Sequence, residues 1–314
     1  MRTTFSSLPS SRCGGTRCMR KIFSLIIAVF IVVGVLFFGG NATAVSNFKV
    51  KLSSYVLQQG NTLFVRVTSE KEPRGTLAGT KLSFLKINGV WITTYGIDVK
   101  KATGNYRLTI RGTYPEIWDK YITVNRKVFP TTRLIITKEL QERGYTATSV
   151  EENIVGQEGQ ELSQILNIYN PTAYFERPFV YPLDKIDISG NFGNIRKSGE
   201  IKLQHLGTDL DADVGVPVYA INDGRVVFTK NLTNDGNTLV IDHGLGIYSL
   251  YLHLNEFKVS LGDMVKKGDV IATVGNTGYS LGSHLHFSVK INNGTSLASV
   301  DPLRFIKSAN KIIQ

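Results

Sequence analysis

Apolar and polar positions alternate with a period of two through residues 46–130 of this chain. Leu63, Val65 and Val67 lie two residues apart, and Leu108 and Ile110 repeat this spacing further along. Successive side chains of a strand point to opposite faces, so the alternation predicts half-buried β-strands. Short strands separated by turn sequences predict a small β-sandwich-like domain over residues 45–130. The turn sequences are Gln59-Gly60-Asn61, Asn88-Gly89 and Gly104-Asn105.

The pattern changes after Pro130. Residues 137–143 and 161–166 have the composition of short helices, and Gly144, Gly156 and Gly159 interrupt the region. Residues 131–178 are therefore expected to form a connector that is partly helical. Strand patterns return with many glycines from residue 179, which predicts an antiparallel β-sheet domain over residues 179–308. The whole chain is predicted to be mainly β.

Composition and charge agree with a folded, two-domain chain. Of its 314 residues 42% are hydrophobic and 19% charged, which excludes a wholly disordered, collagenous or multi-span membrane protein. The two cysteines, Cys13 and Cys18, exclude a zinc site built from four cysteines. The formal net charge is +11, of which the acid-free first 44 residues supply +5. No nucleic-acid-binding signature accompanies it, so the charge indicates a solvated basic surface or weak attraction to anionic wall polymers or lipid headgroups.

The first 44 residues have the pattern of an export device. Arg20 and Lys21 precede an uncharged apolar run over residues 22–38, and the small-residue sequence Ala42-Thr43-Ala44 follows. These three features together are typical of a secretory signal. The run is long for a cleaved signal and slightly short for a stable span of about 20 residues, so residues 1–44 are predicted to be a signal peptide or a membrane anchor. Either alternative predicts an extracytoplasmic protein, in the periplasm or cell wall.

All five histidines of the chain lie between residues 205 and 286. His284 and His286 fall in an apolar run that predicts a strand, so their side chains should project to the same side, roughly 7 Å apart at about 3.4 Å per residue. Leu285 and Phe287 should then face a core. Two imidazoles this close are not both protonated cheaply at neutral pH, and neutral imidazoles are good zinc ligands.

His205 and Asp209 form a second compact pair. Their spacing of four places them on one face of either a strand or a helix, and in an extended segment Gly207 would leave space for an ion between them. One histidine and one aspartate, with one more histidine, make a three-ligand catalytic zinc site whose fourth position is open to water. Nitrogen and oxygen ligands in this ratio favour zinc over calcium or magnesium.

The general base must come from outside a helical zinc-protease motif, because the chain contains no His-Glu-x-x-His. His253 and the second member of the 284/286 pair are suitable, since imidazole titrates near working pH. His243, in the sequence Asp242-His243-Gly244, is interpreted as an ordinary structural residue or as a support for the site.

These residues resemble the lysostaphin-type zinc endopeptidases that cut peptides in bacterial cell walls. The resemblance covers roughly residues 179–306, and the strand-rich segment before it is similar to the small β-domain that precedes the peptidase in some members. The most specific blocks that carry it are Phe192-Gly193-x-x-Arg196, His205-x-Gly207-x-Asp209, Gly236-Asn237-x-x-x-Ile241-x-His243-Gly244, Tyr251-x-His253-Leu254 and Gly282-x-His284-Leu285-His286-Phe287.

The resemblance implies one zinc ion per chain bound by His205, Asp209 and His286, with His253 and His284 as catalytic histidines. It implies a zinc-dependent endopeptidase that hydrolyses amide bonds in the peptide part of peptidoglycan, with water on the metal as nucleophile. The alternative is a catalytically silent wall-binding regulator that activates another hydrolase. Relatives often carry a tyrosine shortly before the first ligand; none lies between residues 192 and 205, which favours stem peptides or direct cross-links over glycine bridges.

Overall fold

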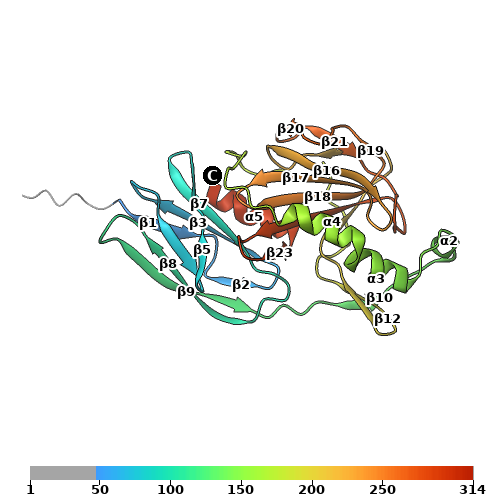
Figure 1. Cartoon of the computed structure of the whole chain (residues 1–314), viewed down its shortest axis with the longest axis horizontal. Helices are drawn as coiled ribbons and strands as arrows, with labels where there is room; N and C mark the ends of the chain where they lie inside the picture. The colour runs from blue at the N-terminus through green and yellow to red at the C-terminus, as the bar shows by residue number, and fades with distance from the viewer. Residues whose placement is uncertain (1–46, 314) are drawn as a thin grey trace, which may run out of the picture. The chain divides into compact units, whose positions relative to one another are not determined.

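The computed structural model describes residues 47–313, which belong to one compact unit (Figure 1). The described residues are mainly strand, which confirms the predicted mainly β class. None of the helices within residues 47–313 is long and apolar enough to cross a membrane. The signal or anchor predicted for residues 1–44 lies outside the described residues.

Two sheets form the N-terminal part of this unit. Leu63 and Val65 of one sheet and Leu108, Ile110 and Ile122 of the other are buried in a common core, as the alternating pattern predicts. The four-stranded sheet has the order β1 (Lys49–Leu52), β3 (Thr62–Thr68), β7 (Val90–Gly96), β6 (Leu85–Ile87). The five-stranded sheet has the order β2 (Val56–Gln58), β9 (Ile117–Asn125), β8 (Gly104–Arg111), β4 (Arg74–Leu77), β5 (Thr80–Leu82).

Strand β3 is buried on both faces. Leu63 and Val65 point into the core between the two sheets, whereas Phe64 belongs to the core of the C-terminal part. The ring of Phe64 lies 5.5 Å from that of Phe305, on the C-terminal helix α5 (Pro302–Ile313). The sequence patterns did not predict α5, which buries one apolar face in the same core.

The segment between the two parts contains three helices. Threonine side chains begin two of them, because Thr137 and Thr146 each accept a hydrogen bond from a backbone N–H of the first turn. Leu162 and Leu166 of the last helix pack against the large C-terminal sheet. The elements are β10 (Thr131–Arg133), α2 (Lys138–Glu142), α3 (Ala147–Val155) and α4 (Gln157–Leu166).

An eight-stranded sheet dominates the C-terminal part, and each of its described strand pairs is antiparallel. Its strands are, in order, β11 (Ile188–Gly190), β14 (Thr208–Asp211), β22 (His284–Asn292), β18 (Ile247–Leu254), β17 (Gly236–Gly244), β16 (Gly224–Leu232) and β20 (Met264–Val265), with β23 (Leu297–Val300) beside β22. Two small sheets flank it: β10 with β12 (Ile195–Ser198) and β13 (Ile201–Gln204), and β15 (Pro217–Tyr219) with β21 (Val270–Thr273) and β19 (Glu256–Phe257).

The two faces of the large sheet have different surroundings. Tyr251 of β18 and Phe287 of β22 point into the main apolar core, which we call the core face. Leu250 and Leu252 of β18 point the other way and contact α4. Because side chains alternate along β22, His286 lies on this second face, which we call the site face.

Candidate metal centre

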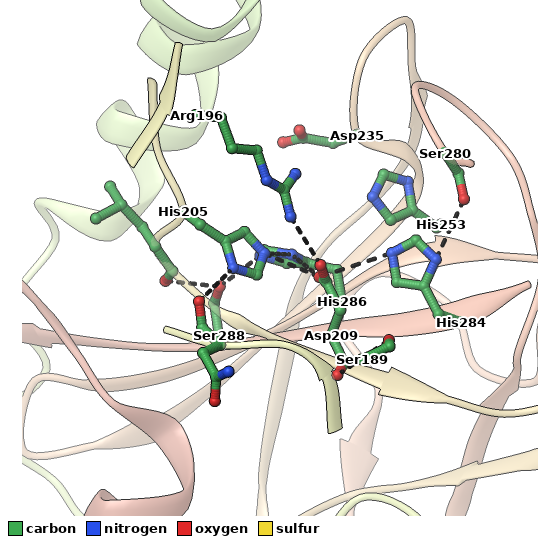
Figure 2. Close-up of polar contacts among 12 residues, drawn as sticks. Ser189, Arg196, His205, Asp209, Asp235, His253, Ser280, His284, His286 and Ser288 are labelled. Carbon is green, nitrogen blue, oxygen red and sulfur yellow. Dashed lines mark hydrogen bonds and ion pairs between the residues drawn. The ribbon is translucent and has the colours of Figure 1, made fainter. Parts of the chain in front are cut away.

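Three side chains converge at one point of the site face (Figure 2). His205 Nε2 lies 2.9 Å from Asp209 Oδ1 and 3.0 Å from His286 Nδ1, and His286 Nδ1 lies 2.8 Å from Asp209 Oδ1. His205 and Asp209 are buried, and His286 is partly buried. The structure therefore brings together all three residues for which the sequence predicts a ligand role.

Strand pairing explains how two of them meet. Asp209 of β14 and His286 of β22 are direct partners in the antiparallel register, so their side chains leave the sheet side by side. His205 follows the end of β13, and the chain bends at residues 205–207 before β14 begins. This bend differs from the strand or helix expected for the segment, and it turns His205 towards Asp209.

Gly207 has a different role from the one the sequence suggested. A Cβ atom at this position would lie 2.3 Å from His286 Nε2 and 2.4 Å from Ser288 Oγ. The glycine therefore makes room for the back of the His286 ring and not for an ion. No other residue fits there without moving His286.

In His205 and His286, the ring nitrogen that points away from Asp209 has a hydrogen-bond partner. His205 Nδ1 donates a hydrogen bond to the carbonyl oxygen of Asn191, at 2.9 Å, because a carbonyl can only accept. His286 Nε2 lies 2.9 Å from Ser288 Oγ, which is also 3.0 Å from the carbonyl oxygen of Leu206. Both rings therefore direct a nitrogen lone pair towards Asp209.

The charges at the centre fit a cation. Burial opposes ionisation of Asp209, but Arg196 donates a hydrogen bond to Asp209 Oδ2 at 2.9 Å, and its positive charge favours the ionised carboxylate. Burial lowers the pKa of His286 to about 4, although Asp209 opposes this shift, so the ring is neutral at pH 7. Three lone-pair atoms within 3.0 Å repel one another unless a cation lies among them. Two imidazoles and one carboxylate are a donor set that suits zinc.

Arg196 adds a positive charge beside this set. Its Nη2 donates to Asp209 Oδ2 at 2.9 Å, from strand β12, and Figure 2 shows the guanidinium directed at the carboxylate. Asp209 therefore uses one oxygen for Arg196 and keeps the other for the two histidines. This contact fixes the orientation of the carboxylate.

The other two predicted residues lie beside the centre. The ring of His253 is 4.9 Å from that of His284, and His284 Nε2 lies 3.6 Å from Asp209 Oδ1. His253 Nδ1 donates to the carbonyl of Thr277 at 2.9 Å, and His284 Nδ1 donates to that of Gly282 at 2.8 Å. Backbone carbonyls thus hold both rings with Nε2 as the remaining nitrogen. Burial lowers the pKa of His253 well below its usual value, and nearby histidines add to this shift.

A β-bulge directs His253 to the site face. Leu239 pairs with Tyr251 and Asn237 with Leu254, so two residues of β18 lie opposite one residue of β17. His253 has a φ of 60°, in the left-handed region that non-glycine residues rarely adopt. Leu252 and His253 therefore both line the cavity beside the centre, although regular alternation would put them on opposite faces.

His243, by contrast, is outside the centre. It is completely buried and contacts Phe179 on the core face. Its Nδ1 donates to the carbonyl of Asp223 and its Nε2 accepts from Ser249 Oγ, both at 2.8 Å. Burial lowers its pKa to about 4. With both nitrogens engaged, His243 is a structural residue of the core.

Two hollows meet at the centre. One, of about 380 Å³, is lined by His205, His253 and His286 together with leucines of β18 and α4. The other, of about 450 Å³, is lined by Asp209, His253, His284 and His286 together with residues 279–283. The two share His253 and His286, so a chain-like ligand crossing from one to the other would pass the metal centre.

Sequence reasoning gave no role to Arg196 or Ser288. Ser288 follows His286 by two residues, so period-two alternation alone could have placed it on the same face. Arg196 belongs to the block Phe192-Gly193-x-x-Arg196, but the block gave it no role, because its approach to Asp209 depends on how β12 lies against the sheet.

The antiparallel sheet and its histidine–aspartate cluster define a metallopeptidase-like site, and the comparisons agree. Residues 203–300 match the model of Peptidase family M23 and form an M23 peptidase domain. A crystal structure described as a peptidase M23 from Pseudomonas aeruginosa shares the fold, with a TM-score of 0.51 at 24% identity, over 78% of this chain and 93% of that chain.

Curated relatives each match about a third of the chain. The peptidoglycan DD-endopeptidase ShyB of Vibrio cholerae is 40% identical over 118 residues, which are 36% of this chain and 28% of ShyB. The glycyl-glycine endopeptidase ALE-1 of Staphylococcus capitis is 41% identical over 108 residues, which are 33% of this chain and 30% of ALE-1. The matched region spans less than a third of the length of either relative.

Proposed function

We propose that this protein is a zinc-dependent endopeptidase that hydrolyses amide bonds in the peptide part of peptidoglycan. The convergence of His205 Nε2, Asp209 Oδ1 and His286 Nδ1 within 3.0 Å carries the proposal. These three residues would hold one zinc ion. When bound, zinc supplies Lewis acidity, which polarises an amide carbonyl and makes water more acidic.

His253 and His284 would act directly on the substrate. Each presents Nε2 beside the centre while its Nδ1 is held by a backbone carbonyl, so neither ring needs to reorient during the reaction. One imidazole would accept the proton of the attacking water at Nε2, and the other, carrying a proton on both nitrogens, would donate a hydrogen bond from Nε2 to the oxygen on which negative charge develops. Either histidine could take either role, because both rings present Nε2 in the same way.

The substrate class is supported by the relatives and by the site's shape. ShyB is named a peptidoglycan DD-endopeptidase and ALE-1 a glycyl-glycine endopeptidase, so both are named for peptide cleavage. The two hollows that meet at the centre suit an extended peptide. We further propose that the protein acts outside the cytoplasm, since residues 20–44 have the composition of an export signal.

Digestion of purified walls tests this function. The protein should release muropeptides from at least one of several wall types, a chelator should abolish the release, and zinc should restore it. Mass spectrometry of the products identifies the bond that is cut. His205→Ala should lose zinc, whereas His253→Ala should keep zinc and lose about 10²–10⁴ in rate.

The exposed Lys185→Ala variant is the matched control and should behave as the unaltered protein. Full activity of both histidine variants would contradict the proposal. Stoichiometric zinc without release from any wall would favour the regulator that activates another hydrolase. The presence of all five site residues speaks against that alternative.

A further inference from the structure

We propose that Ser288 is a positioning residue of the metal centre, which holds His286 in the tautomer that presents Nδ1 to the metal. The inference rests on the proposed function, because it concerns the same ligand set. It differs from that function in its subject: Ser288 lines the first hollow but acts on the metal centre through its contact with His286.

The single hydroxyl hydrogen of Ser288 determines which atom donates in its contact with His286. Ser288 Oγ lies 3.0 Å from the carbonyl oxygen of Leu206 and 2.9 Å from His286 Nε2. A carbonyl can only accept, and a serine hydroxyl has a single hydrogen. Once that hydrogen is given to Leu206, the oxygen of Ser288 can only accept, so His286 must carry its proton on Nε2. Nδ1 is then left with a lone pair.

The opposite tautomer would compete with metal binding. A proton on Nδ1 would point at Asp209 Oδ1, only 2.8 Å away, and would form a hydrogen bond to an ionised carboxylate. Such charge-assisted bonds are among the strongest that side chains make. Metal binding would then require this bond to break and the proton to leave. Ser288 disfavours this state by engaging Nε2.

The surroundings strengthen the contact. Ser288 and His286 are the cross-strand partners of Leu250 and Leu252, whose side chains lie in the apolar cluster beside α4. Ser288 is only 3% exposed, so water competes little for its hydroxyl. Gly207 leaves the space that this hydrogen bond occupies, since an added Cβ would lie within 2.4 Å of both of its atoms.

The two histidine ligands differ in how their tautomer is secured. His205 donates to a backbone carbonyl, that of Asn191, which no side-chain substitution removes. His286 depends on a side chain. A single substitution at Ser288 therefore tests the positioning role at one ligand and leaves the other ligand intact.

The test compares Ser288→Ala with Ser288→Thr in the full chain. Outer partners of metal-binding histidines typically contribute 10–100-fold to affinity, so Ser288→Ala should weaken zinc binding by about that factor in a chelator competition. Ser288→Thr keeps the hydroxyl and should stay within a few-fold of the unaltered protein. Nitrogen-15 NMR of the zinc-free protein should show His286 protonated on Nε2, with a shift towards Nδ1 protonation in Ser288→Ala.

Ser249→Ala is the matched control. Ser249 makes a serine–histidine hydrogen bond of 2.8 Å to His243 on the core face of the same sheet. Its loss should lower thermal stability and leave zinc affinity unchanged, which separates a structural effect from positioning of the ligand.

The inference would be overturned if Ser288→Ala bound zinc as tightly as the unaltered protein. It would also be overturned if the tautomer of His286 were unchanged in this variant. Failure of the unaltered protein to bind zinc at all would instead overturn the proposed function. The NMR measurement needs no metal and no substrate, so it reads the positioning role independently of activity.

Discussion

His243 and His286 lie in the same antiparallel sheet, on opposite faces, and each is hydrogen-bonded to a serine. His243 donates from Nδ1 to a carbonyl and accepts at Nε2 from Ser249, so both of its nitrogens are used inside the core. His286 uses only Nε2 in this way and directs Nδ1 towards Asp209. The partner of the second nitrogen therefore distinguishes a structural histidine from a candidate ligand.

The pKa does not separate the two residues. Burial lowers the pKa of His243 and of His286 to about 4 in each case. What differs is the neighbourhood: His243 contacts the ring of Phe179, whereas His286 has His205 and Asp209 within 3.0 Å. Changes around His286 should therefore alter zinc binding, and changes around His243 should alter stability.

The largest effect is expected from Asp209→Ala. This change removes one of three donors and the only negative charge among them. Zinc affinity should therefore fall by more than about 100-fold, which exceeds the loss expected when a residue that hydrogen-bonds a metal ligand is removed. Isothermal titration with zinc measures it. Asp242→Ala, which alters a carboxylate at the end of β17, is the control and should bind zinc normally. Equal losses in the two variants would contradict a ligand role that is specific to Asp209.

A smaller loss of zinc affinity is expected from Gly207→Ala. The added methyl group would lie 2.3 Å from His286 Nε2, so the ring must move away from Asp209. Zinc affinity should fall by about 10–100-fold, as for other changes behind a ligand. Gly282→Ala is the matched control, because nothing lies within 4 Å of its added Cβ. Tight zinc binding by Gly207→Ala would show that the centre tolerates a displaced ring.

Arg196→Ala should have a weaker effect, about 10-fold on zinc affinity. The substitution frees Asp209 Oδ2, which then lacks its 2.9 Å partner, and the carboxylate can rotate. Arg177→Ala breaks an exposed ion pair with Asp223 and serves as the control in the same chelator competition. A gain in affinity for Arg196→Ala would mean that the guanidinium competes with the metal for the carboxylate.

The smallest effect is on the core face, and it depends on pH. The pKa of His243 is about 4 in the folded protein against about 6.5 when unfolded, so between these values only the unfolded chain binds the proton. Stability should therefore fall as the pH drops from 6.5 to 4, by at most about 1.4 kcal/mol per pH unit from this group. Denaturant unfolding of the unaltered protein and of His243→Gln at pH 7 and pH 5 measures the difference. An identical pH dependence in both would contradict the assignment.

The correct predictions from the sequence came from regular periodicity. It predicted a strand at residues 284–291 with His284 and His286 on one side, and β22 spans His284–Asn292 with both side chains beside Asp209. Local pattern also predicted the strands of the N-terminal part and helices near those of α2 and α4. Each of these features depends on residues close together in the chain.

The remaining features depend on contacts between distant segments. The bend at residues 205–207 is possible because Gly207 fits against β22, and the approach of Arg196 requires β12 to lie near β14. The turn of His253 to the site face arises from an irregular register between β17 and β18. A period-two pattern assumes regular pairing, so it would place His253 and Leu252 on opposite faces.

Because of that irregular register, the length of β18 affects which side chains line the hollow beside the metal centre. With one residue fewer between Tyr251 and Leu254, β18 could pair with β17 without interruption. Only one residue would then lie between them, so Leu252 and His253 could not both line the hollow, even though every candidate ligand would still be in place. Shortening β18 by one residue should therefore impair turnover more selectively than most substitutions, and the spacing of this strand is as much a part of the chemistry as its histidine.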